Sequence, residues 1–279
     1  MLKGTSTAGP ALDITRTARF EAQSQVRSAL GLVWKVRHHL PPPARSALRL
    51  LVDLVLAHRV GSLSGVRTKE SVIGLTFDDG PDPTTTPAVL DVLAAHGARA
   101  TFFLLAHRAE ALPAIACRII EEGHEVGLHG ADHRPPAGLE RNELGRWFQD
   151  GRRRLESVVS RSVLYFRPPC GSQSLRSYLA SRRAGLQVVV WSAHAADWEG
   201  GTPAEVTARG LTGIAPGRIL LLHDGYEPDP RQPIPDLKLD RGAVAALLMD
   251  QLATRGYRTA TISQLVTGRP PIRTAWFRP

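Results

Sequence analysis

Residues 71–268 follow a regular pattern in which short apolar runs alternate with longer amphipathic stretches. Apolar runs of four to six residues, closed by polar or turn-forming residues, are typical of buried strands. We expect such strands over residues 72–77, 100–105, 125–128, 163–166, 186–191, 218–222 and 257–262. Stretches of helical period lie between them, over residues 86–96, 109–122, 139–159, 173–184, 203–212 and 240–255, with a short helix starting at Ser263.

This alternation decides the expected fold class. Parallel strands need a crossover connection, which is usually a helix, whereas antiparallel strands can be joined by short turns. About seven strand–helix units therefore predict an α/β protein, built as a (β/α) barrel or as a doubly wound sheet. In both architectures the chemistry is placed at the carboxyl ends of the strands.

The N-terminal quarter of the chain does not share this pattern. Helical periodicity predicts helices over residues 20–36 and 44–58, separated by three consecutive prolines that cannot continue a helix. Residues 61–70 are expected to be a linker that leads into the strand–helix region. We therefore interpret residues 1–70 as a partly helical N-terminal extension, residues 71–268 as the main domain and residues 269–279 as a C-terminal tail.

The extension also carries most of the net charge of +9. Residues 1–70 hold 11 Lys and Arg against 4 Asp and Glu, whereas the rest of the chain holds 24 against 22. Such a basic segment can make peripheral contact with an anionic surface, although a merely solvated extension fits the pattern equally well. Basic residues interleaved with aromatic ones do not occur, so we expect no nucleic-acid partner.

Apolar stretches and cysteines restrict the location only loosely. Residues 48–60 are the most apolar N-terminal run, but they are too short to span a bilayer and contain Arg49 and Asp53. No signal peptide is evident, which favours the cytoplasm by default and leaves a membrane-peripheral or envelope location open. The two cysteines, Cys117 and Cys170, cannot form a disulfide framework. The sequence does not specify an oligomeric state.

Two adjacent carboxylates close the first predicted strand. Asp78 and Asp79 follow the apolar run 72–77 and precede the turn-forming pair Gly80-Pro81. Neighbouring residues of an extended strand point to opposite faces, so we expect the two carboxylates to have different roles. An ordinary solvated Asp-Asp-Gly turn is the alternative for this stretch alone.

Further polar clusters follow the later strands. His129 closes a strand and His133 lies in the loop after it, and two imidazoles with one carboxylate suit a divalent cation, zinc before others. A strand end also precedes each of three other groups, which are Arg167-Pro168-Pro169-Cys170, Asp197-Trp198 and His223-Asp224. Each cluster alone could be structural, but five of them at successive strand ends favour an active site.

Together these residues resemble the polysaccharide deacetylase family, also known as the NodB-homology domain or carbohydrate esterase family 4. The resemblance covers about residues 71–265, and its most specific motif is intact as Thr76-Phe77-Asp78-Asp79-Gly80-Pro81. It implies a distorted (β/α) barrel and metal-dependent hydrolysis of N-acetyl groups on an amino-sugar glycan or glycoconjugate. Residues 71–268 would then be the deacetylase domain.

The resemblance also implies roles for individual residues. Asp79, His129 and His133 would bind the metal ion, most simply Zn²⁺, with Co²⁺ as a second choice. Asp78 would be the general base, oriented by Arg167, and His223 would be the general acid, with Asp197 setting its state. The residues expected to line the substrate site are Pro169, Cys170 and Trp198.

Three positions depart from the family pattern. Gly130 stands where a Ser or Thr with a supporting role is usual, and Cys170 stands where Tyr is usual. Relatives often carry an acid where this chain has His194. We expect metal binding to survive the first change and substrate packing to differ with the second, whereas the third makes the role of Asp197 less secure than the metal set.

Other readings of the same residues remain open. A related metal-dependent hydrolase of a non-sugar linear or cyclic amide would use the same site. A catalytically inactive glycan-binding protein would be expected to have lost Asp78 or His223, and both are present. A phosphatase-type site predicts phosphate-binding Lys and Ser/Thr motifs after the later strands, whereas this chain has His-rich clusters there. The Pro-rich segment 227–238 is either a substrate-selecting loop or a rigid surface loop.

Overall fold

The computed structural model of the protein describes residues 57, 60–227 and 239–275. These residues belong to one unit that starts at Ala57. The predicted helix 20–36 lies outside the described residues. So do the predicted helix 44–58, apart from residue 57, and most of the Pro-rich segment. The strands are β1 (Ser62–Val66), β2 (Val72–Asp78), β3 (Thr101–Leu105), β4 (Glu125–Gly130), β5 (Tyr165–Phe166), β6 (Gln187–Val188), β7 (Ala193–His194), β8 (Ile219–His223), β9 (Arg258–Ala260) and β10 (Pro271–Thr274). The helices are α3 (Thr85–Ala95), α4 (Ala106–Ala111), α5 (Pro113–Glu121), α6 (Arg141–Val159), α7 (Leu175–Arg183), α8 (Pro203–Thr212), α9 (Arg241–Thr254) and α10 (Ile262–Val266), with short 3-10 helices η1 (Pro169–Gly171) and η2 (Asp197–Glu199).

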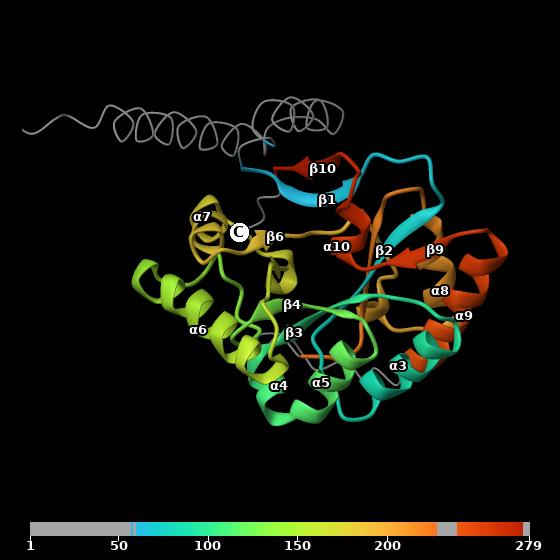
Figure 1. The fold of residues 1–279 in the computed structure, drawn as a ribbon, viewed down its shortest axis with the longest axis horizontal. Helices are drawn as coiled ribbons and strands as arrows, with labels where there is room; N and C mark the ends of the chain where they lie inside the picture. Colours follow the sequence, from blue (N-terminus) through green and yellow to red (C-terminus); the bar gives the residue numbers. More distant parts are fainter. Residues whose placement is uncertain (1–56, 58–59, 228–238, 276–279) are drawn as a thin grey trace, which may run out of the picture. The chain divides into compact units, whose positions relative to one another are not determined.

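A parallel sheet forms the centre of the domain. Its strands run in the order β6-β5-β4-β3-β2-β8-β7, and β9 also pairs with β2. The two end strands, β6 and β7, are separated in the chain only by residues 189–192, so the sheet curls round on itself. Helices cover the outside of this curled sheet (Figure 1). The predicted α/β fold, a distorted barrel of about seven strands, is confirmed.

Strand β2 lies in the interior of the sheet. All seven of its residues are buried, and it pairs with β3, β8 and β9. Strands of a parallel sheet are covered on both faces, which is why the run 72–77 is continuously apolar rather than alternating. The carboxylate of Asp78 is therefore carried on a rigid strand into the interior.

Two strands lie outside the predicted bounds of the main domain, residues 71–268. Part of the predicted linker 61–70 is the buried strand β1, which pairs antiparallel with β10 from the predicted tail 269–279. Each strand is short and carries no strong apolar alternation, so neither was evident alone. The pairing of Ser62 with Thr274 joins segments that are more than two hundred residues apart in sequence, and such contacts leave no local signal.

Two predicted elements are divided in the structure. The helix expected over residues 109–122 is two helices, α4 and α5, because Pro113 cannot continue a helix and instead begins α5. The strand expected over residues 186–191 is reduced to β6 and one further bridge between Val189 and Leu63, after which the chain crosses to the short strand β7.

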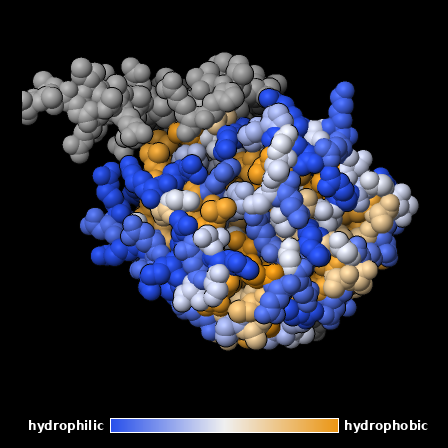
Figure 2. Space-filling view, in the orientation of Figure 1, coloured by the Kyte–Doolittle hydropathy of each residue, from blue (hydrophilic) through white to orange (hydrophobic). Residues whose placement is uncertain are grey.

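The face of the molecule seen in Figure 2 is largely polar. Figure 2 shows mostly hydrophilic residues on the visible face, with smaller apolar areas between them. Among the described residues, no helix combines the length and the apolar character needed to cross a membrane.

Candidate functional site

The predicted polar clusters meet at the edge of the sheet where the parallel strands end. Asp78, the last residue of β2, lies in register with His223, the last residue of β8. His129 lies near the end of β4, and Arg167 directly follows β5. These strands occupy one continuous part of the sheet, β5-β4-β3-β2-β8, so residues far apart in the sequence share one site.

The two adjacent carboxylates face the same site rather than opposite sides of the sheet. Strand geometry ends at Asp78, and Asp79 adopts a φ of 72°, a left-handed conformation that Asp tolerates better than most residues. Asp79 Oδ1 lies 3.2 Å from His129 Nε2, while Asp78 Oδ2 lies 3.9 Å from Nδ1 of the same ring. The expectation of opposite faces is therefore wrong, because it assumed an extended backbone through Asp79.

Asp79, His129 and His133 form a candidate metal site. One ligand atom from each lies within 4.8 Å of the others, and Asp79 Oδ1 is 3.3 Å from His133 Nε2. His129 Nδ1 donates to the carbonyl oxygen of Arg167 at 2.9 Å, which leaves its Nε2 free to coordinate. Asp79 Oδ1 is buried and has no hydrogen-bond partner among the described residues. A buried carboxylate oxygen without a donor, facing two imidazoles, fits a divalent cation.

The charge of this cluster also suits a cation. Burial alone would raise the pKa of Asp79, but the two imidazoles that face it outweigh burial and hold that pKa well below its usual range. Asp79 is therefore ionised at neutral pH and available as an anionic ligand.

Arg167 holds the second carboxylate, Asp78. Its Nη1 donates to Asp78 Oδ1 at 2.7 Å and to Thr76 Oγ1 at 2.8 Å. The guanidinium is fully buried and its carbon lies 4.2 Å from the centre of the Phe103 ring. Burial lowers the pKa of Arg167 and Asp78 counteracts this, so the cation persists because of its carboxylate partner. Asp78 is thus fixed in orientation by a side chain that cannot move into solvent.

A third charged group surrounds His223. Its Nδ1 donates to Asp197 Oδ1 at 2.8 Å, and its backbone N–H donates to Asp197 Oδ2 at 2.8 Å. Burial alone would lower the pKa of His223, but the charge of Asp197 and its hydrogen bond raise the pKa to about 9. His223 is therefore protonated at neutral pH and can give a proton to a group that faces its Nε2.

Arg241 completes this group and was not predicted. Its Nη1 donates to Asp197 Oδ2 at 2.7 Å and to the carbonyl oxygen of His223 at 2.8 Å, and the residue is only 7% exposed. It opposes the effect of burial on Asp197 and, together with His223, lowers the pKa of that carboxyl. A signal was present in the sequence, because Arg241 is the first residue of a helix, where a cation is electrostatically unfavourable without a partner.

The residues predicted to line a substrate site lie around these groups. Trp198 is 37% exposed, and its ring centre lies 5.6 Å from that of His223 and 5.2 Å from that of His194. Pro169 and Cys170 form a tight 3-10 turn two residues after Arg167, with Pro169 buried and the Cys170 side chain exposed. The Trp–His contact places an aromatic face beside the candidate acid.

The departure at Gly130 has a structural cause. A Cβ at this position would lie 2.6 Å from Cζ2 of Trp147 and 2.5 Å from the carbonyl oxygen of Asp132. Gly130 also has a φ of 136°, which residues with side chains rarely adopt. The supporting hydroxyl that relatives carry here has no room in this chain.

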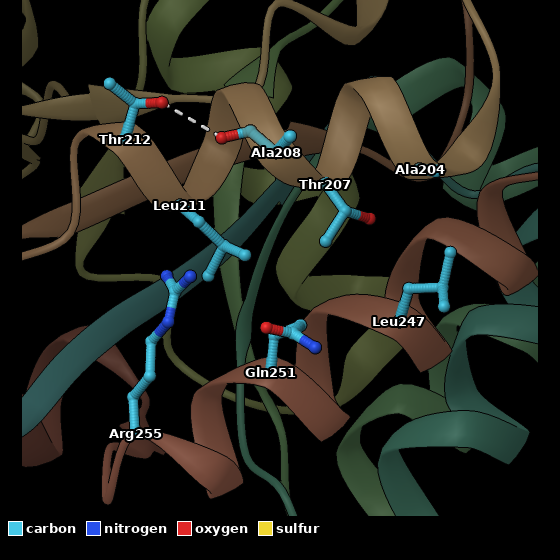
Figure 3. A pocket seen from close by; sticks show the side chains of 8 residues that line it. All are labelled: Ala204, Thr207, Ala208, Leu211, Thr212, Leu247, Gln251 and Arg255. Atoms are coloured by element: carbon cyan, nitrogen blue, oxygen red, sulfur yellow. Dashed lines mark hydrogen bonds between the residues drawn. The ribbon is translucent and has the colours of Figure 1, made fainter.

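A separate hollow lies between helices α8 and α9 (Figure 3). Thr207, Leu211, Leu247 and Gln251 are among the residues that line it, and none of the predicted site residues takes part. Figure 3 shows small residues, threonines and Leu211 of α8 beside Leu247 and Gln251 of α9, and Arg255 is the only titratable residue among the described residues that line the hollow. The predicted site residues lie at the strand ends and not in this hollow.

The chain is similar in sequence to known deacetylases. Residues 65–189 match a family model described as polysaccharide deacetylase. A peptidoglycan-N-acetylglucosamine deacetylase from Bacillus cereus is 34% identical over 203 residues, which cover 72% of this chain and 91% of the relative. A chitooligosaccharide deacetylase from a Bradyrhizobium species is 34% identical over 208 residues, covering 74% of this chain and 93% of the relative.

A solved structure has the same fold and contains a metal ion. It is a family 4 acetyl xylan esterase from Clostridium thermocellum in complex with cobalt, with a TM-score of 0.62 and 28% identity. The match covers 70% of this chain and 90% of the esterase.

Proposed function

This chain belongs to the polysaccharide deacetylase family, and from that premise we propose that it hydrolyses the N-acetyl groups of an amino-sugar glycan or glycoconjugate and releases acetate. The observation that supports this most directly is the meeting of three groups at one edge of the sheet. These are the Asp79–His129–His133 set, the Asp78–Arg167 pair and the Asp197–His223 pair.

Asp79, His129 and His133 would hold the cation. When bound there, a divalent ion supplies positive charge that polarises an amide carbonyl and lowers the pKa of water from about 16 towards about 7. Asp78 accepts a proton from the water as it attacks the acetyl carbonyl carbon. Arg167 keeps Asp78 aimed at the site, because it holds one carboxylate oxygen and leaves the other beside His129.

His223 acts on the opposite side of the reacting amide. The bond between the carbonyl carbon and the sugar nitrogen breaks easily only if the nitrogen is protonated, because an amide anion is a very poor leaving group. His223, which carries a proton at neutral pH, donates it to this nitrogen. Asp197 holds the imidazole through Nδ1, so that Nε2 is the proton-donating atom. The products are acetate and a free amine on the sugar.

Zinc is the first candidate for the ion and cobalt the second. Two imidazole nitrogens and one carboxylate, with remaining positions open to water and substrate, are typical of catalytic zinc sites. The cobalt ion in the related esterase supports cobalt as a functional substitute.

The substrate is proposed to lie against Trp198 and the turn of Pro169 and Cys170. An exposed aromatic face beside the acid His223 suits the apolar face of a sugar ring. The named activities of the relatives make peptidoglycan and chitooligosaccharides the first two glycans to test.

The test is acetate release from N-acetylglucosamine oligomers and from peptidoglycan, with metal-stripped protein and with protein reloaded with Zn²⁺ or Co²⁺. We expect release only from reloaded protein, and a loss of about 10²–10⁴-fold for Asp78→Asn, the range typical of a missing general base. Metal content is measured in parallel by atomic absorption.

Two other outcomes would change the proposal. Stoichiometric metal binding without acetate release from any glycan would favour hydrolysis of a non-sugar amide at the same site. Absence of bound metal at saturating Zn²⁺ would remove the basis of the site assignment.

A further inference from the structure

The loop between the two metal-binding histidines lies against helix α6. Gly130, Ala131 and Asp132 separate His129 from His133, and each of the three lies close to a residue of this helix. We propose that Trp147 and Gly151 of α6 are positioning residues that set the separation of the two histidines and so the affinity for the cation. This inference rests on the proposed function, because it concerns the same metal site.

Trp147 acts through both its ring and its N–H group. The ring fills the space beside Gly130, where an added Cβ would lie 2.6 Å from it. Its Nε1 donates to Asp132 Oδ1 at 2.9 Å. The Asp132 carboxylate also accepts from the backbone N–H of Arg134 at 3.2 Å, so it links the residues on both sides of His133. One indole therefore holds both ends of the loop.

The indole itself is held rigidly. Trp147 is buried and packs edge-on against Phe148 and Phe166, with ring centres 5.0 Å and 6.1 Å away. Phe166 ends β5 and pairs with β4 next to His129, at the register of Leu128. Through Trp147 and Phe166, the loop is thus held in place relative to β4 and β5, the two strands that lead to His129 and Arg167.

Gly151 lies one helical turn after Trp147, on the same face of α6. A Cβ on Gly151 would lie 2.9 Å from the backbone nitrogen of Ala131 and 3.2 Å from its Cα. Backbone atoms cannot rotate away as a flexible side chain can, so a larger residue must displace the loop. Helix α6 therefore contacts the loop in two ways. The large ring of Trp147 fills the space beside Gly130, and the absence of a side chain at Gly151 lets the backbone of Ala131 lie close to the helix.

These contacts replace the support that a hydroxyl at position 130 would give. Groups behind metal ligands typically change metal affinity by about 10–100-fold when they are mutated. We expect Trp147→Phe, which keeps a ring but loses the N–H donor, to raise the dissociation constant for Zn²⁺ and Co²⁺ by about tenfold or more. Gly151→Ala should have a similar effect through displacement of Ala131.

The helix offers matched controls. Gly145 lies on α6 with nothing within 4 Å of an added Cβ, so Gly145→Ala changes the same residue type in the same helix without touching the loop. Val159→Ala removes buried packing at the C-terminal end of the same helix, about two turns beyond Gly151. We expect both controls to bind Zn²⁺ and Co²⁺ as the wild type does, even though Val159→Ala lowers the melting temperature.

The measurement is titration calorimetry of the full chain with Zn²⁺ and Co²⁺, alongside thermal unfolding of the metal-free variants. Weaker binding by Trp147→Phe and Gly151→Ala, with unchanged binding by both controls, supports the proposal. Equal affinity in all five proteins would overturn it, while leaving the deacetylase assignment intact. Failure of the wild type to bind either metal would instead contradict the proposed function. If Gly151→Ala does not fold, Trp147→Phe alone decides.

Discussion

The site contains two aspartate–histidine groups that use the same residue types in different surroundings. Asp79 shares one oxygen between two imidazole nitrogens, and that oxygen has no hydrogen-bond partner among the described residues. Both oxygens of Asp197 are occupied, by His223 Nδ1, the His223 N–H and Arg241. The first carboxylate has capacity left for a cation, whereas the second has none.

This difference in free hydrogen-bonding capacity gives the two carboxylates separate roles, although both are aspartates paired with histidine. A carboxylate with an unused, buried oxygen attracts a positive ion to complete its surroundings. A carboxylate that is already saturated by donors can only orient and charge its histidine. The metal group and the acid group should therefore respond differently to mutation.

The largest effect is expected from Asp79→Asn. Asn tolerates the left-handed backbone at this position almost as well as Asp, so the fold should persist while the anionic ligand is lost. We expect loss of stoichiometric Zn²⁺ binding, measured by calorimetry, and loss of acetate release. Asp91→Asn, at an exposed helical position, is the control that should change neither. Retained metal binding would show that the three residues do not form the site.

The next effect separates the acid group from the metal group. His223→Gln removes the proton donor, and we expect kcat to fall by about 10²–10⁴-fold while Zn²⁺ still binds with wild-type stoichiometry. Loss of both properties together would mean that His223 supports the metal, and the comparison between the two groups would then fail. Acetate release and metal content should be measured on the same preparation.

Arg241→Met tests whether the acid group depends on its buried cation. Removing one partner of a buried ion pair leaves an uncompensated charge, which typically lowers the free energy of unfolding by about 3 kcal/mol or more. Urea denaturation measures this change, and Arg241→Lys should restore part of it. Arg255→Met, at an exposed position just after the same helix, should stay within about 0.5 kcal/mol of the wild type.

The smallest expected effect is a shift in the titration of His223. In chelator-treated protein its pKa should be about 9, measured by NMR of the labelled imidazole. Asp197→Asn should lower this pKa, because the charge and the hydrogen bond of Asp197 raise it. A bound cation should lower it too, since it offsets the negative charge of Asp78 and Asp79. A pKa that is insensitive to Asp197→Asn would contradict the pairing.

The raised pKa of His223 also makes the free energy of unfolding depend on pH. The folded protein binds the His223 proton more tightly than the unfolded chain, whose histidine pKa is about 6.5. The stabilisation from this group is therefore complete below about pH 6.5 and is lost as the pH rises through about 9.

Most strands of the sheet and most residues of the candidate site could be predicted from the sequence, for physical reasons. Buried parallel strands must be apolar throughout, so runs such as residues 72–77 stand out from their surroundings. Asp78, His129 and His223 could be located because each follows or closes such a run. Their placement at one edge follows from the direction of parallel strands alone.

What the sequence did not reveal depends on contacts between distant segments. Trp147 reads as an ordinary apolar residue of a helix, and only its approach to Gly130 gives it a second role. Arg241 follows a Pro-rich segment that carries no periodicity, and its partner Asp197 lies in a short turn. The backbone of Asp79 leaves strand geometry within one residue, which a periodic pattern cannot express.

The pairing of β1 with β10 also bears on how this domain can be rebuilt. These strands are the first and the last of the described elements, and they run antiparallel beside each other. An antiparallel pair places the start of one strand next to the end of the other, so the two points of attachment lie on the same side of the domain. A short linker could join them, and new termini could be opened in an exposed loop such as residues 160–162. The domain is thus suited to circular permutation, and to insertion as a unit into a surface loop of a host protein.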